Sequence, residues 1–125
     1  MKRNVSARLL ATFFIVGGAL HFVFPAAYSD IMPPWLPWHR ELVLISGAVE
    51  IAGGLGVLAA STRRFAGLGL IALSIAVWPA NLQMLLDACA AQKALWWQAT
   101  LLLRLPLQLA LIYWIWRATQ NAAAD

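Results

Sequence analysis

Long apolar stretches alternate with short polar links along the whole chain. Four stretches are long enough to cross a lipid bilayer as helices, which takes about 20 apolar residues each. They cover approximately residues 6–28, 41–60, 65–86 and 95–116. The pattern predicts an all-α protein with one membrane domain, residues 1–125, built as a bundle of four transmembrane helices.

The links between these stretches differ in character. The link at residues 61–64 is short, so the second and third helices are expected to form an antiparallel pair. The link at residues 29–40 contains three prolines and two tryptophans: Pro33, Pro34, Trp35, Pro37 and Trp38. Proline disfavours a regular helix, and tryptophan prefers the membrane interface. These features predict an interfacial loop, either an anchor, the commoner role, or a lid that dips into the membrane.

Basic residues mark the expected orientation in the membrane. One side collects Lys2, Arg3, Arg8, Arg63, Arg64 and Arg117, and the other collects Arg40 and Lys93. The positive-inside rule then places both termini in the cytoplasm and the loop at residues 29–40 outside. The start of the chain resembles a signal peptide, but its apolar run at residues 9–24 is long for a signal core. We therefore expect this segment to remain as the first helix.

Composition narrows the functional classes. Hydrophobic residues make up 62% of the chain and charged residues 11%, against roughly 25% charged in a soluble domain. The net charge of +4 does not indicate nucleic-acid binding, because the basic residues are scattered and form no binding motif. Cys89 is the single cysteine, so a thiol relay within the chain is excluded, although exchange with a partner's thiol stays open. His21 and His39 have no ligand spacing around them, so no metal site is predicted.

Two opposite charges lie inside the apolar stretches. A charge at the centre of a membrane helix disfavours insertion by about 2.5–3.5 kcal/mol, so such residues usually have a partner or a function. At about 1.5 Å per residue, Glu50 and Arg104 both lie about 13 Å below the outer helix ends, which makes them candidates for an ion pair. In a functional site, Arg104 would hold an anionic or carbonyl oxygen and Glu50 would orient it or accept a proton. The alternative is a structural pair that fixes helix register, and the sequence leaves both open.

Three further polar residues are expected in the same outer half of the bundle. His21 lies near the outer end of the first helix, Asn81 lies near that of the third, and Gln108 follows Arg104 by one turn. A membrane histidine can relay protons or bind a carbonyl oxygen, but more often it bonds to a neighbouring helix. Asn81 and Gln108 are expected mainly to hold helices together. Each predicted helix thus contributes a candidate ligand-binding or polar-core residue.

Several motifs occur in order along nearly the whole chain. They are GALHFVFP at residues 18–25, PPWLP at 33–37, LVLISGAVEIAGG at 42–54, WPANLQM at 78–84 and RLPLQ at 104–108. Together they resemble the DoxX-like membrane proteins. The resemblance implies four transmembrane helices in a bacterial cytoplasmic (inner) membrane. It also implies a redox association, because one member is a membrane subunit linked to thiosulfate oxidation with quinone as acceptor, and others are linked to oxidative-stress partners.

Three functional classes follow from these observations. The favoured one is a small redox-associated membrane subunit that binds quinone, or another small apolar molecule, in a polar outer-leaflet site. Such a chain would hold no cofactor of its own, would work with redox-protein partners, and would be part of an oxidoreductase rather than a self-sufficient enzyme. The alternative is a non-catalytic membrane scaffold whose Glu50–Arg104 pair is structural. A carrier would need polar residues below Gln108, and there are few. The exposed lipid-facing surface of four short helices is also compatible with a homodimer.

Overall fold

Five α-helices lie in the part of the chain that the structure describes. The computed structural model describes residues 2–120, so residues 1 and 121–125 of the predicted domain lie outside it. The helices within that range are α1 (Lys2–Val23), α2 (Pro25–Asp30), α3 (His39–Leu58), α4 (Arg63–Ala90) and α5 (Leu95–Thr119), and the same range contains no strand. All except α2 are long and apolar enough to cross a membrane. The all-α class and the four long helices are therefore confirmed, and they fit a multi-pass membrane protein.

One predicted helix is wrong, because the stretch at residues 6–28 is two helices. Proline lacks an N–H and pushes the preceding residue out of the helical region. Phe24 accordingly has φ −126° and ψ 55°, and the chain restarts at Pro25 as the short α2. The other predicted helices differ only at their ends: α4 extends past residue 86 to Ala90, and α5 extends past residue 116 to Thr119.

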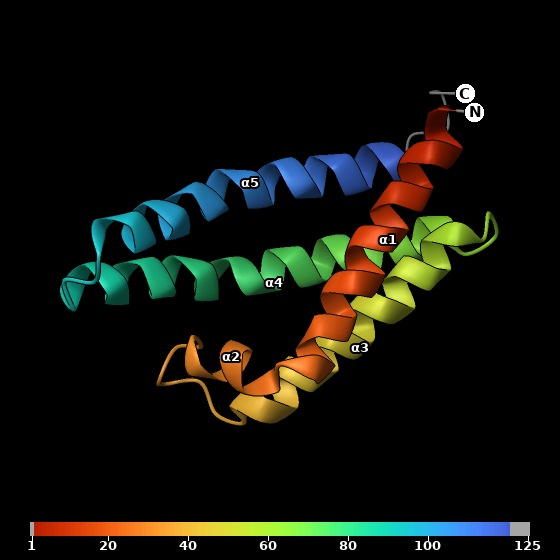
Figure 1. Ribbon diagram of the computed structural model, residues 1–125. Helices are drawn as coiled ribbons and strands as arrows, with labels where there is room; N and C mark the ends of the chain where they lie inside the picture. The colour runs from red at the N-terminus through yellow and green to blue at the C-terminus, as the bar shows by residue number, and fades with distance from the viewer. Residues whose placement is uncertain (1, 121–125) are drawn as a thin grey trace.

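The long helices form two hairpins that meet at one end (Figure 1). Helix α1 packs against α3, and α4 packs against α5. The hairpins lie close together where α1 begins and α5 ends, and they diverge toward the opposite end, where α2 lies between them. Helix α1 begins and helix α5 ends at the same end of the bundle, as expected for a chain that crosses a membrane an even number of times.

The apolar core lies at the end where the hairpins meet. It contains residues from all four long helices: Ala7, Leu10, Phe14, Val57, Leu70, Ile115 and Ala118. Hydrogen bonds reinforce this end. Trp114 Nε1 donates to Ser6 Oγ over 2.8 Å, and Arg63 Nε donates to the Val57 carbonyl over 2.8 Å. This end is therefore closed by packing as well as by polar contacts.

Glycines allow α1 and α3 to approach closely. A Cβ added at Gly18 would lie 2.5 Å from the Gly47 carbonyl oxygen, and one added at Gly47 would lie 2.7 Å from His21 Cβ. Small residues at a helix contact let backbones come together in membranes. This approach brings His21 on α1 next to Glu50 on α3.

The outer surface of the helices is apolar. In each of the four long helices, no more than 28% of the most apolar 18-residue segment is buried within the protein. Large side chains such as Phe65 (78% exposed) and Leu95 (81% exposed) point outward. Such a surface suits contact with lipid rather than water.

Candidate functional site

A cavity of about 380 Å³ lies in the opening between the two hairpins, and α2 and the loop that follows it form part of its wall. This volume lies within the range of roughly 300–1,000 Å³ that is typical of small-molecule sites. The polar side chains on its wall are His21, Tyr28, Ser46, Glu50, Ser74, Asn81, Arg104 and Gln108. Apolar side chains, Phe14, Leu73 and Val77 among them, form most of the remaining wall.

The first polar pair of the cavity joins α1 and α3. His21 Nδ1 lies 2.9 Å from Glu50 Oε2, and the two side chains are 14% and 20% exposed. Neither of these two atoms has an aligned hydrogen bond, so the two groups are in close contact and form an ion pair when the imidazole is protonated. The ring of Tyr28 on α2 lies against the imidazole, with the ring centroids 4.1 Å apart. The pair is thus held between the glycine contact of α1 and α3 and the ring of Tyr28.

The second polar pair joins α4 and α5. Arg104 Nη2 donates to Asn81 Oδ1 over 3.1 Å, and Asn81 is 7% exposed. One turn farther along α5, Gln108 Nε2 donates to the Ser74 carbonyl over 3.3 Å. Among residues 2–120, no carboxylate pairs with the Arg104 guanidinium. On this side of the cavity, Arg104 and Gln108 therefore donate to neutral oxygens, one of a side-chain amide and one of a backbone carbonyl.

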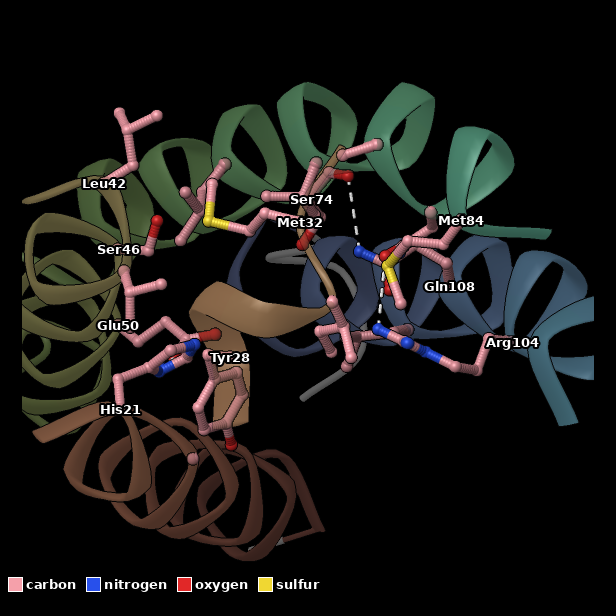
Figure 2. Close-up of a pocket in the computed structure, with 18 of the residues that line it drawn as sticks. His21, Tyr28, Met32, Leu42, Ser46, Glu50, Ser74, Met84, Arg104 and Gln108 are labelled. Atoms are coloured by element: carbon pink, nitrogen blue, oxygen red, sulfur yellow. Dashed lines mark hydrogen bonds and ion pairs between the residues drawn. The ribbon is translucent and has the colours of Figure 1, made fainter. Parts of the chain in front are cut away.

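The expected ion pair between Glu50 and Arg104 is not formed. Each residue instead has its partner within its own hairpin: Glu50 pairs with His21, and Arg104 pairs with Asn81. The close contact of α1 with α3 holds the Glu50 carboxylate against the imidazole, and the packing of α4 on α5 holds the guanidinium against the amide. All four residues line the same cavity, and Figure 2 shows His21 and Glu50 on the opposite wall from Arg104.

All five residues predicted from the sequence as ligand-binding or polar-core candidates line this one cavity: His21, Glu50, Asn81, Arg104 and Gln108. Sequence reasoning missed Tyr28, Ser46 and Ser74, which line it too. Tyr28 could have been predicted from Pro25, because the proline breaks the helix and the following α2 turns back over the cavity. Ser46 lies one turn before Glu50 on α3, and that spacing was the signal for it.

The loop between α2 and α3 has two different sides. Pro33 is buried and lines the cavity together with Ile31 and Met32. Trp35 and Trp38 are 65% and 73% exposed, as a membrane-surface anchor requires. Pro34 and Pro37 are exposed as well. The loop therefore combines the geometry of a lid on one side with an exposed aromatic surface on the other.

A second cavity of about 420 Å³ adjoins the first on the other side of this loop. Its wall carries the charged residues Asp30, Asp87 and Lys93. Ile31, Met32 and Met84 line both cavities, so they form the partition between them.

Within residues 2–120, no group of three or more His, Cys, Asp or Glu side chains is arranged to hold a metal ion. Cys89 is exposed near the end of α4 and does not line the main cavity. Its Sγ donates to Gln98 Oε1 over 3.4 Å.

Comparison with known proteins assigns a family but no activity. No curated protein and no solved structure matches the chain. Residues 10–119 match the sequence model of a family described as Domain of unknown function (DUF8561). This match includes every residue that lines the main cavity. The chain therefore belongs to the DUF8561 family.

Proposed function

We propose that this protein binds a small lipophilic molecule with a polar head in the cavity between its hairpins. We further propose that it is a redox-associated subunit of a bacterial cytoplasmic membrane, with both termini inside. The observation that carries the binding proposal is the cavity of about 380 Å³, whose wall receives polar side chains from every membrane-spanning helix. Polar groups are expensive to keep within a bilayer, so a cluster of them around an open space favours a ligand.

Quinone is the ligand class that we propose first. A quinone combines an apolar ring and tail with two oxygens, and the cavity combines apolar walls with polar groups on two sides. The resemblance to DoxX-like proteins favours the same class. Electrons would pass to or from a redox-protein partner, because the only cysteine, Cys89, lies outside the cavity.

A non-catalytic scaffold is the alternative function. A bundle packed throughout its length would favour it. The open cavity at the divergent end favours the ligand-binding proposal instead.

Ligand extraction and thermal unfolding test the proposal. The protein, purified in mild detergent, should release quinone on solvent extraction, and added decylubiquinone should raise its unfolding temperature. Ligand at about 100 times its Kd stabilises a protein by about 2.7 kcal/mol, which is readily measured.

Two adjacent residues on α3 provide a matched control for this experiment. Ser46 lines the cavity, whereas Ile45 is 59% exposed on the outer surface. Ser46→Trp should fill the cavity and abolish the thermal shift, and Ile45→Trp should retain it. Absence of extracted quinone, together with no shift in the wild-type protein, would contradict the proposal.

A further inference from the structure

The two polar walls of the cavity have opposite hydrogen-bonding character. One wall belongs to the first hairpin and carries the His21–Glu50 pair, and the other belongs to the second hairpin and carries Arg104 with Asn81. Figure 2 shows the Glu50 and Arg104 side chains extending toward the space between the hairpins from opposite sides. Any ligand that spans the cavity meets both walls.

The Arg104 wall donates hydrogen bonds. A guanidinium has five N–H donors and no acceptor. Within residues 2–120 it makes one hydrogen bond, from Nη2 to Asn81 Oδ1, and it has no carboxylate partner. Its remaining donors therefore favour a ligand oxygen that accepts.

The Glu50 wall accepts hydrogen bonds. When the proton of the His21–Glu50 pair lies on the imidazole, the carboxylate is an acceptor only. Glu50 Oε2 is buried beside the imidazole, whereas the side chain as a whole is 20% exposed and lines the cavity. A carboxylate on the cavity wall favours a ligand group that carries an O–H or N–H.

We propose that the cavity selects the hydroxyl form of a hydroquinone-type aromatic compound over its oxidised quinone form. One ligand oxygen accepts from Arg104, and the hydroxyl at the opposite end of the ring donates to Glu50. A quinone has acceptors at both ends, so one of its carbonyl oxygens would face the Glu50 carboxylate without a proton between them. The inference rests on the proposed function and specifies which redox form the site holds.

Binding of two probes that differ only in redox form tests this proposal. Decylubiquinol, kept reduced under anaerobic conditions, and decylubiquinone are titrated separately into the purified protein, and the two Kd values are compared. A hydrogen bond to a charged group corresponds to about tenfold or more in affinity, so the wild-type protein should bind the quinol at least about tenfold more tightly.

Two variants that each remove one charge test whether Glu50, rather than Arg104, causes the preference for quinol over quinone. Glu50→Gln offers an amide donor as well as an acceptor, so the ratio of the two Kd values should fall close to one. Arg104→Gln should weaken both forms and keep the ratio, because both forms carry an acceptor oxygen at that end.

The outcomes separate this inference from the proposed function. Equal binding of the two forms by the wild-type protein, or tighter binding of the quinone, overturns the inference and leaves the proposed function standing. An unchanged ratio in a folded Glu50→Gln variant also overturns it. Binding of neither form by the wild-type protein refutes the proposed function itself.

Discussion

The contact between α1 and α3 allows a specific prediction about stability. It requires that residue 18 have a hydrogen atom where every other amino acid has a Cβ. An alanine Cβ there would lie 2.5 Å from the Gly47 carbonyl oxygen and 2.8 Å from Ile51 Cγ1, whereas ordinary contact begins at 3.4 Å. The backbone oxygen cannot rotate away as a side chain can. Gly18→Ala must therefore push the two helices apart by several tenths of an ångström along their contact.

The expected loss follows from two opposing terms. Overpacking of this kind costs typically about 1–3 kcal/mol, and a rigid backbone neighbour favours the upper part of that range. Replacing glycine by alanine within a helix returns up to about 1 kcal/mol. We therefore expect Gly18→Ala to lower the free energy of unfolding by about 2 kcal/mol. Separation of the helices should also weaken quinol binding, because it moves His21 away from Glu50.

Reversible unfolding in mixed micelles measures this change, and Gly69 provides the matched control. A Cβ added at Gly69, on α4, meets nothing within 4 Å. Gly69→Ala should therefore keep or raise the free energy of unfolding by up to about 1 kcal/mol. Equal unfolding free energies for the Gly18→Ala and Gly69→Ala variants would refute the close packing of α1 against α3.

Three further predictions concern the ion pair, the orientation and the partition between the cavities. A double-mutant cycle on His21→Gln and Glu50→Gln should give a coupling energy of about 0.5–3 kcal/mol in unfolding, because the two side chains are in contact. Cys89 is exposed near the end of α4, which the proposed orientation places outside, so a membrane-impermeant maleimide added to intact spheroplasts should label it. Met32 is part of the partition between the two cavities, and a ligand that enters through the second cavity must pass it, so Met32→Trp should slow quinol association in stopped-flow measurements.

Each of these predictions has its own control. A cycle on Glu50→Gln and Arg104→Gln should be close to additive, because these residues pair within different hairpins; a large coupling would reinstate a direct contact between them. A cysteine at Arg63, in a Cys89→Ser background, should escape the maleimide, and its labelling would reverse the proposed orientation. Trp35→Ala changes only the exposed side of the loop and should leave association unchanged. An association rate unaltered by Met32→Trp would mean that the ligand reaches the cavity by another route.

The apolar pattern predicted the long helices well and their lateral contacts poorly. Helix existence follows from the length and hydropathy of each stretch, which are local properties. The depth of Glu50 and Arg104 follows from helix rise, and both residues do line one cavity. Depth does not specify which helix faces which, and the partner of Glu50 was set by the contact between Gly18 and Gly47. The prediction that Glu50 and Arg104 lie at the same depth could therefore agree with the structure while the predicted ion pair between them was wrong.

The prolines show the same limit. Pro25, Pro79 and Pro106 all lie in apolar stretches, yet only Pro25 ends a helix. Pro79 and Pro106 lie inside helices that pack against each other, where neighbouring groups can satisfy the carbonyls that a proline frees. Pro25 is the first residue of α2, which lies near the divergent end where the hairpins separate. Local sequence does not distinguish these surroundings.

The division of the bundle into a closed end and an open end explains why ligand binding should be measurable as stability. At the closed end, hydrogen bonds such as that from Trp114 to Ser6 join the two hairpins directly. At the cavity, the polar pairs of residues 2–120 stay within one hairpin each, so the hairpins can change their separation there without breaking either pair. A ligand held by Glu50 and Arg104 together would supply the missing polar link. It would stabilise the divergent end in proportion to its affinity, because it binds only when both walls are in place.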